Sequence, residues 1–283
     1  MHKLLLIGSQ GQVGRELQRC LAPLGELAVR DRTTLDLSNA AALRAAIRGE
    51  RPDVVVNAAA YTAVDQAEQE PALALRINGE APAVMAEEAK KLGALLVHYS
   101  TDYVFDGAKD GPYQEDDAPN PLSVYGRTKL AGEQAIGAAG CRHLIFRTSW
   151  VYGLYGKNFL RTMQRLGRER EELRVVDDQI GAPTWSRMIA ETTALALRQP
   201  AADGIYHLCC AGVTSWHGFA AAILAAQNWS GRLSPIPASA YPLPARRPAN
   251  SRLDNGKLQR LLGLALPDWR SALGLCLADQ AER

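Results

Sequence analysis

The stretch that decides the fold is KLLLIGSQGQVGRELQ, residues 3–18. It opens with an apolar run that shows no alternation, which is typical of a strand buried on both faces of a parallel sheet. The glycines Gly8, Gly11 and Gly14 follow at once, with apolar residues at helical spacing behind them. Glycine suits this position because the turn is tight, the backbone must approach a pyrophosphate and the helix must pack near the strand. The order of strand, glycine turn and helix therefore predicts a dinucleotide-binding unit with the anion at the helix N-terminus.

The same alternation continues through the N-terminal half of the chain. Further strands are predicted at 26–31, 53–60, 94–100 and 143–149, and helical stretches at 38–49 and 71–92, the second interrupted near Asn78 to Pro82. Strands that are separated by helices imply right-handed crossovers between parallel neighbours. The predicted fold class is α/β, a Rossmann-type doubly wound parallel sheet.

Beyond Trp150 the alternation is less regular. Helices are predicted near 157–168, 185–198, 215–227, 254–262 and 267–279, strands at 172–176 and 204–209, and an extended or looping segment at 234–248, which contains five prolines. We expect residues 1–149, with returning elements at about 172–212, to form the NAD(P)-binding domain. Residues at about 150–171 and 213–283 are expected to form a smaller C-terminal substrate-binding lobe over the ends of the sheet, where this fold places its ligand.

Composition limits the classes of partner. The 283 residues are 47% hydrophobic, enough for a sizeable core, and Lys plus Arg outnumber Asp plus Glu by only 32 to 30. Such a balance gives no general field for nucleic acid. The five cysteines are odd in number and lack Cys-x-x-Cys spacing, so disulfides and a zinc site are not expected. Because no apolar run approaches the ~18 residues of a membrane span, we expect a reduced, soluble, cytoplasmic protein that binds neither nucleic acid nor membrane.

Tyr125 and Lys129 lie four residues apart in NPLSVYGRTK, residues 120–129. In a helix this spacing puts both side chains on the same side, and Ser123 is placed to begin that helix as its N-cap. The spacing alone is weak, since many such pairs occur by chance on solvated helix faces. The surrounding sequence must decide whether the pair is catalytic.

The second predicted strand ends at Asp31, 17 residues after Gly14. An acidic residue near this place usually meets the adenosine ribose, which favours NADH. The neighbouring Arg30 and Arg32 could instead accommodate a 2′-phosphate, which favours NADPH. Both cofactors stay open, and Asp36 is a second candidate near the adenine.

With the glycine turn in place, Tyr125 and Lys129 fall where a short-chain dehydrogenase/reductase carries its catalytic pair. Longer strings resemble one family of the extended branch of that superfamily, the dTDP-4-dehydrorhamnose reductases. These strings are LLIGSQGQVGRELQ, RPDVVVNAAAYTAVDQAE, HYSTDYVFDG, YGRTKLAGE, FRTSWVYG, DDQIGAPT and ARRPANSRLD. The resemblance runs from residue 3 to about residue 275, and it is far more specific than any single motif.

The resemblance implies reduction of the C4 ketone of dTDP-4-dehydro-L-rhamnose by NADPH or NADH. Tyr125 would supply the proton, Lys129 the positive charge that eases its release, and Thr101 a hydrogen bond to the carbonyl or to the tyrosine. Asp102 and Trp150 match positions where this family contacts substrate, as Thr101 also would. The expected cofactor-binding residues are Gly8, Gly11, Gln12, Val13, Gly14, Asp31, Asp36, Leu37, Ala60, Tyr61, Thr62, Tyr99, Tyr125 and Lys129.

Two other readings stay open. Another nucleotide-sugar enzyme of the superfamily is possible, although a 4,6-dehydratase is expected to carry a second carboxylate after Thr101 and Asp102, where this chain has Tyr103. A non-catalytic, dinucleotide-binding regulatory subunit is the second alternative, and loss of Tyr125 or Lys129 would have favoured it.

The resemblance also bears on assembly. Magnesium-linked dimers of this family bring two glutamates to the interface, one of them matched here by Glu16, whereas the second position is Arg187. A positive side chain there would repel a cation. We therefore expect no metal site, activity without magnesium, and a possible homodimer that is held in another way.

Overall fold

The computed structural model describes residues 2–199 and 203–282. Six parallel strands form the central sheet in the order β10-β5-β4-β3-β1-β2. Their bounds are β1 (His2–Ile7), β2 (Gly25–Arg30), β3 (Val54–Asn57), β4 (Leu95–Thr101), β5 (His143–Thr148) and β10 (Gly204–His207). The order reverses direction between β1 and β3, so the carboxyl ends of these two strands mark the crevice where a doubly wound sheet binds its ligand. The predicted fold class is confirmed.

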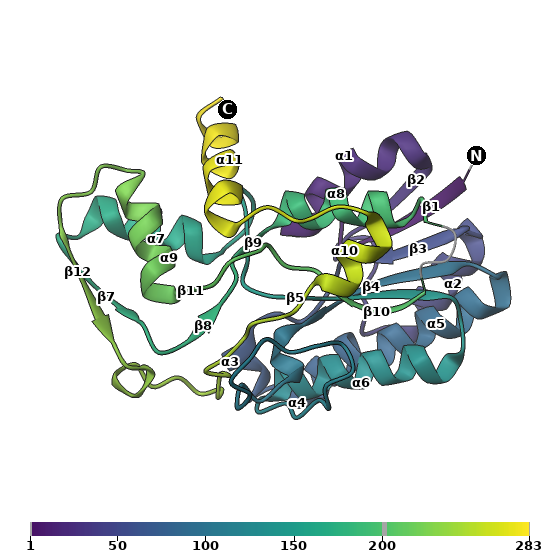
Figure 1. The fold of residues 1–283 in the computed structure, drawn as a ribbon. Coiled ribbons are helices and arrows are strands. Elements are labelled where there is room, and N and C mark those ends of the chain that lie inside the picture. The colour runs from purple at the N-terminus through teal and green to yellow at the C-terminus, as the bar shows by residue number, and fades with distance from the viewer. Residues whose placement is uncertain (1, 200–202, 283) are drawn as a thin grey trace.

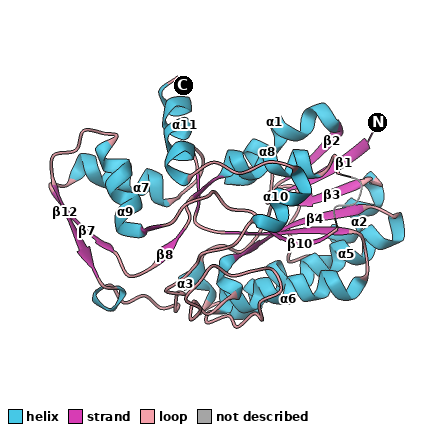
Figure 2. Cartoon of the chain, viewed as in Figure 1, coloured by secondary structure: helices cyan, strands magenta, loops and turns pink. Residues whose placement is uncertain are grey.

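Helices cover both faces of this sheet, as Figures 1 and 2 show. On one face lie α1 (Gln12–Leu21), α8 (Ser186–Ala196) and α10 (Gly256–Leu262), and on the other α2 (Ala40–Glu50), α5 (Ala81–Leu92) and α6 (Val124–Ala139). The strand residues alternate between the two resulting cores: Leu4 and Leu6 face the first, Leu5 and Ile7 the second. Burial on both faces explains the unbroken apolar run of β1.

The interruption predicted near Asn78 to Pro82 is a π-helical segment, η2 (Arg76–Glu80), between α4 (Pro71–Leu75) and α5. Pro82 has no backbone N–H, so the carbonyl of Asn78 cannot receive the usual α-helical hydrogen bond. That carbonyl instead lies against α6, where a Cβ on Gly132 would come within 2.2 Å of it. The π-helical turn thus allows two helices to approach closely beside the ligand edge of the sheet.

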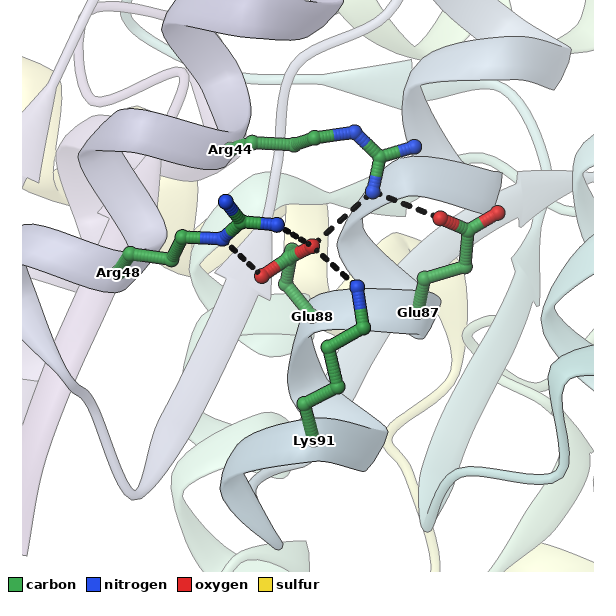
Figure 3. Close-up of polar contacts among 5 residues, drawn as sticks. All are labelled: Arg44, Arg48, Glu87, Glu88 and Lys91. Atoms are coloured by element: carbon green, nitrogen blue, oxygen red, sulfur yellow. Dashed lines mark hydrogen bonds and ion pairs between the residues drawn. The ribbon is translucent and has the colours of Figure 1, made fainter.

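Helix α5 is tied to α2 by a cluster of charged side chains (Figure 3). Glu88 on α5 has only 1% of its surface exposed and accepts hydrogen bonds from Arg44 and Arg48 of α2 and from Lys91 of its own helix. These bonds, led by the one from Arg48, hold the pKa of the Glu88 carboxyl far below its usual value. The buried carboxylate therefore has partners on both helices that cover this face.

A smaller group of elements lies beside the sheet. It contains α7 (Phe159–Glu169), α9 (Trp216–Ala225) and α11 (Trp269–Ala281), whose apolar residues form a separate core, together with three short pairs of strands. The pairs are β7 (Glu172–Val176) with β12 (Arg232–Ile236), β8 (Ile180–Gly181) with β11 (Thr214–Ser215), and β6 (Val151–Tyr152) with β9 (Thr184–Trp185). The remaining short elements are η1 (Ala22–Leu24), α3 (Val64–Ala67), η3 (Asp102–Val104) and η4 (Ala238–Ala240).

One expectation about the division of the chain needs correction. We expected the chain to return to the large sheet from about residue 172, but β7 pairs with β12 and takes no part in that sheet. The return begins with α8, which packs against α1, and continues with β10. Conversely, Leu258 of α10, from the predicted lobe, belongs to the core of the large sheet. In the two described ranges, no helix is long and apolar enough to cross a membrane.

Candidate functional site

The glycine turn lies between β1 and α1 and brings strand and helix into close contact. Gly8 has a φ of +86°, and a Cβ there would lie 2.6 Å from the backbone nitrogen of Ala59. A Cβ on Gly14 would lie 2.0 Å from the carbonyl oxygen of Gly8, so no larger residue fits. Gly11 is exposed at the N-terminus of α1. Close backbone packing and an open helix N-terminus are what a pyrophosphate site requires, so the turn fits a dinucleotide.

The side chains of Gln12 and Val13 have neighbours within the protein. Gln12 Oε1 accepts a hydrogen bond of 2.8 Å from Asn158 Nδ2, and Val13 packs on the core between the sheet and α1. The backbone N–H groups at the start of α1 have no partner within the helix and are available to a phosphate.

The predicted adenosine side follows β2. Asp31 Oδ1 accepts hydrogen bonds from the Thr33 hydroxyl and from the backbone nitrogens of Thr33 and Thr34, and these bonds lower the pKa of its carboxyl. Asp36 binds Ser38 in the same manner, and Leu37 is buried in the core. Of the two arginines, Arg30 has a carboxylate partner, Glu50, and Arg32 is exposed beside Asp31.

The segment after β3 contains Ala60, Tyr61 and Thr62. Its backbone is held by Asn78 of the π-helical turn, whose Oδ1 accepts from Tyr61 N at 2.8 Å and whose Nδ2 donates to Tyr61 O at 3.1 Å. The Tyr61 hydroxyl donates to Glu70 Oε2, and burial together with this carboxylate raises the pKa of Tyr61 to about 12. Asn78 Nδ2 also donates to Thr128 of α6, so the segment and the helix of Tyr125 are joined.

At the end of β4, Thr101 and Asp102 are both buried. Thr101 Oγ1 donates to Asp102 Oδ1 at 2.9 Å and also hydrogen-bonds Tyr125. Burial raises the pKa of Asp102 to about 6, while hydrogen bonds from Ser251 and Thr101 oppose the rise. Thr101 Oγ1 therefore links the Asp102 carboxyl to the Tyr125 phenol.

Helix α6 presents Tyr125 and Lys129 as the spacing predicts. It begins after Ser123, whose Oγ accepts a hydrogen bond of 3.2 Å from Gly126 N, so the predicted N-cap is confirmed. Tyr125 is half-buried with its ring edge-on to Tyr103 at 5.8 Å, and burial raises its pKa to about 12. Lys129 is 1% exposed, and burial lowers its pKa to about 8.

Lys129 Nζ has two partners on β4. It donates to the carbonyl oxygen of Tyr99 and lies 3.0 Å from His98 Nε2, while His98 Nδ1 lies 3.0 Å from Asn57 Nδ2. The Tyr99 side chain lies on the opposite face of the sheet, where its hydroxyl meets Thr193 at 2.8 Å. Asn57 and His98 are not among the site residues predicted from the sequence. Asn57 lies in the string RPDVVVNAAAYTAVDQAE and His98 begins the string HYSTDYVFDG, so both belong to stretches that resemble the family. Nothing in these stretches shows that the two residues contact each other or Lys129.

Trp150 follows β5 and has a φ of +48°, unusual for so bulky a residue. Its ring stacks on Trp216 with 3.7 Å between centroids and 7° between planes. A Cβ on Gly181 would come within 2.7 Å of the Trp150 ring, so the glycine leaves room for the indole. Strain at a bulky aromatic residue is typical of a functional position.

Two arginines of the string ARRPANSRLD form hydrogen bonds or ion pairs with neighbouring residues. Arg247 makes a two-pronged ion pair with Asp65, with distances of 2.7 and 3.1 Å. Arg252 donates to Asn250 Oδ1 and to the carbonyl of Asp110. Asp65 lies on α3, after β3, and Arg247 lies in the proline-rich segment, so this ion pair joins that segment to the ligand edge of the sheet.

Comparison with known proteins agrees with this geometry. The family model described as RmlD substrate binding domain matches residues 1–282. Among similar proteins, the dTDP-4-dehydrorhamnose reductase of Burkholderia thailandensis is 52% identical, with 98% of each chain covered. That of Escherichia coli K12 is 49% identical, with 94% of each covered. A crystal structure of dTDP-4-dehydrorhamnose reductase from Bacillus anthracis in complex with NADP superposes with a TM-score of 0.93 at 36% identity, covering 98% of this chain and 99% of the other.

The relatives match over nearly their whole length, and the matched residues include the glycine turn, the end of β4 and the Tyr125 helix. The chain therefore belongs to the dTDP-4-dehydrorhamnose reductase family.

Proposed function

We propose that the protein reduces the C4 ketone of dTDP-4-dehydro-L-rhamnose to dTDP-L-rhamnose with NADPH or NADH, the last step of dTDP-L-rhamnose biosynthesis. The observation that carries the proposal is the joint placement of Thr101, Tyr125 and Lys129 at the ligand edge of the sheet. Membership in a family whose curated relatives bear the name of this reductase supports the substrate.

The bound dinucleotide would supply the hydride, and the residues of the chain manage the proton. Tyr125 donates its phenolic proton to the carbonyl oxygen as negative charge develops there. A buried phenol with a pKa of about 12 releases its proton reluctantly, so a cation is needed beside it. We assign Lys129, one turn along α6, as that cation, and Thr101 as the donor of a hydrogen bond to the oxygen. Asp102 and Trp150 are proposed to contact the substrate.

The glycine turn, the segment after β3 and the end of β4 surround the crevice at which this sheet reverses its strand order, so we assign the cofactor to it. The predicted set of Gly8, Gly11, Gln12, Val13, Gly14, Asp31, Asp36, Leu37, Ala60, Tyr61, Thr62, Tyr99, Tyr125 and Lys129 stays our proposal for its contacts. The NADP complex of the Bacillus anthracis relative supports NADPH, and the exposed Arg32 is compatible with it.

The alternatives are less well supported. A dehydratase needs a second carboxylate after Asp102, and the next side chain is Tyr103, whose ring packs on Tyr125. A regulatory subunit needs no proton donor, yet Tyr125 and Lys129 are both present on the same helix. We also propose the division into a cofactor domain and a substrate lobe, and a possible homodimer. A cytoplasmic location is proposed as well, and the five free thiols support it.

Replacing Tyr125 by phenylalanine tests the catalytic assignment. We expect turnover of dTDP-4-dehydro-L-rhamnose to fall by about 10²–10⁴-fold, because the proton donor is lost while the ring remains. NADPH binding should stay nearly unchanged. Both quantities follow from the absorbance of NADPH and from calorimetric titration.

The matched control is Tyr152→Phe, which removes the hydroxyl of a fully buried tyrosine in the core of α7, α9 and α11. Its turnover should equal that of the unaltered protein. Near-normal turnover in Tyr125→Phe would refute the assignment, and an unaltered protein without turnover with either cofactor would refute the proposed function.

A further inference from the structure

Three buried side chains form a hydrogen-bonded row beneath the candidate site. Asn57 ends β3 and His98 lies on β4, and the parallel register places them directly opposite each other. Lys129 reaches them from α6, which covers this face of the sheet. Each of the three is only 1% exposed. The two contacts in the row, Asn57 Nδ2 to His98 Nδ1 and His98 Nε2 to Lys129 Nζ, both measure 3.0 Å.

The row determines which nitrogen of His98 bears the hydrogen. Asn57 Oδ1 accepts a hydrogen bond from the backbone nitrogen of Ala59 at 3.1 Å, so the Asn57 atom that faces His98 is the amide nitrogen, a donor. His98 Nδ1 must then be an acceptor. Burial holds the pKa of His98 well below its usual value, so the ring is neutral. A neutral imidazole has one N–H, and here it is on Nε2.

The Nε2–H of His98 points at Lys129 Nζ, and this has a consequence for the amine. An ammonium group has three donors and no acceptor, whereas a neutral amine offers a lone pair. A neutral Lys129 accepts from His98 and donates to the carbonyl of Tyr99, so both contacts are satisfied. The ammonium form would instead face the His98 donor.

Burial is the main cause of the lowered pKa of Lys129, and the charged groups around it change that pKa less. Glu133, one turn further along α6, opposes the lowering of the Lys129 pKa, but Glu133 is paired with Arg147 of β5 at 2.7 Å. Tyr125, one turn earlier, is a neutral phenol with a raised pKa. With a pKa of about 8, Lys129 populates both forms near that pH.

We propose that His98 is a positioning residue, which, with its tautomer fixed by Asn57, favours the neutral amine of Lys129 and holds that form against β4 until the cofactor binds. Lys129 then leaves His98, takes one proton from the solvent and acts as the cation beside Tyr125. The proton forms a bond to Nζ, and His98 keeps its Nε2 hydrogen throughout. This inference rests on the role of Lys129 in the proposed function.

Nitrogen NMR of the cofactor-free protein with ¹⁵N-labelled histidine tests the tautomer directly. We expect His98 to show a protonated Nε2 and an unprotonated Nδ1 above about pH 8, where Lys129 is chiefly the neutral amine, because the pKa of His98 lies far below this range. Its signals can be assigned by elimination, from single glutamine variants of His2, His143, His207 and His217. A proton on Nδ1, or a doubly protonated ring, would overturn the proposal even if no variant of His98 folds.

Calorimetric titration of the whole protein with NADPH tests the proton uptake. Near pH 8 the binding heats in two buffers of different ionisation enthalpy should give an uptake of about half a proton per site, because Lys129 is then half neutral before binding. In His98→Gln the side-chain oxygen can turn to accept from the ammonium, so the uptake should fall at least twofold. The rise of the NADPH Kd with pH, expected above about pH 8, should move to higher pH.

The matched control is His207→Gln on β10, the edge strand that β5 separates from β4. His207 is also fully buried, and its Nδ1 meets the carbonyl of Asp254, so it has no part in the row. Equal uptake in the unaltered protein and in His98→Gln, or an equal loss in His207→Gln, contradicts the proposal. Absence of turnover with the sugar would refute the proposed function. The tautomer of His98 and the proton uptake on NADPH binding would still be decided by their own measurements.

Discussion

Asp102 is a carboxyl group whose burial works against the stability of the protein. Burial raises its pKa from 3.8 to about 6, so the folded protein keeps a proton that the unfolded chain releases between these values. The unfolded state therefore binds fewer protons, and stability falls as pH rises from 3.8 to about 6. A shift of this size corresponds to about 2–3 kcal/mol above pH 6. Such a cost is typical of a residue kept for function.

Replacing Asp102 by asparagine should therefore stabilise the protein while impairing turnover. At pH 7.5 we expect the free energy of unfolding in urea to rise by about 2 kcal/mol, and its decline between pH 4 and pH 6 to disappear. The exposed Asp110→Asn is the control and should change neither quantity. An unchanged or lowered stability of Asp102→Asn would show that the buried carboxylate is not costly.

The residues that the sequence could predict are those whose role depends on local order. The glycines of the turn, Ser123 as the N-cap, and the pair Tyr125 and Lys129 need only neighbours in the chain. Asn57 and His98 were not predicted, because their contact depends on the register of two strands and on the helix that covers them. Sequence patterns reveal that such strands are buried, and they do not reveal which polar atoms meet.

At the scale of elements, the contact between α2 and α5 depends on Glu88. Its carboxylate is depressed in pKa and buried against Arg44 and Arg48, so its contribution to stability is present above its ordinary value of 4.5 and is lost as the pH falls further. Glu88→Gln should lower the free energy of unfolding at pH 7 by about 2 kcal/mol, since hydrogen bonds to charged groups are lost.

Glu87→Gln is the matched control for Glu88→Gln. Glu87 binds the same Arg44, but half of its side chain is exposed, at 49%, and such pairs contribute about 0–1 kcal/mol. Chemical denaturation of both variants at pH 7 gives the comparison. Equal losses in the two variants would contradict the importance of burial at Glu88.

The elements themselves were largely predictable, whereas one pairing was not. The strand at 172–176 was expected near the large sheet, yet it pairs with β12, which includes Pro235. An edge strand of a two-stranded pair accommodates a proline at a position where the missing N–H would face no partner. Short strands carry little information about their partner, because many apolar edges would accept them.

At the scale of the whole molecule, one guanidinium group joins three helices. Arg187 of α8 lies 3.2 Å from Glu16 of α1 and 3.0 Å from Asp279 of α11. Glu16 is only 1% exposed, and its charge is thus balanced within the chain. A divalent cation would have to displace Arg187 to bind this carboxylate.

We therefore expect activity without magnesium. Dialysis against EDTA should leave the rate of NADPH oxidation unchanged, and light scattering should report the same mass with and without Mg²⁺. Arg187→Glu, which places a second acidic side chain beside Glu16, provides the comparison, because only this variant should respond to the metal. Loss of activity in EDTA and its recovery with Mg²⁺ in the unaltered protein would contradict the expectation.

The core that contains Leu4 and Leu17 also contains Leu258 and Leu266, far along the chain. A ribosome makes the first strand early, but this side of the sheet, which α1 and α8 cover in part, is completed only when the residues of α10 have been added and released from the exit tunnel. During that interval an exposed apolar sheet would need a chaperone, so a truncated chain that stops before α10 is expected to aggregate instead of yielding a working nucleotide-binding fragment.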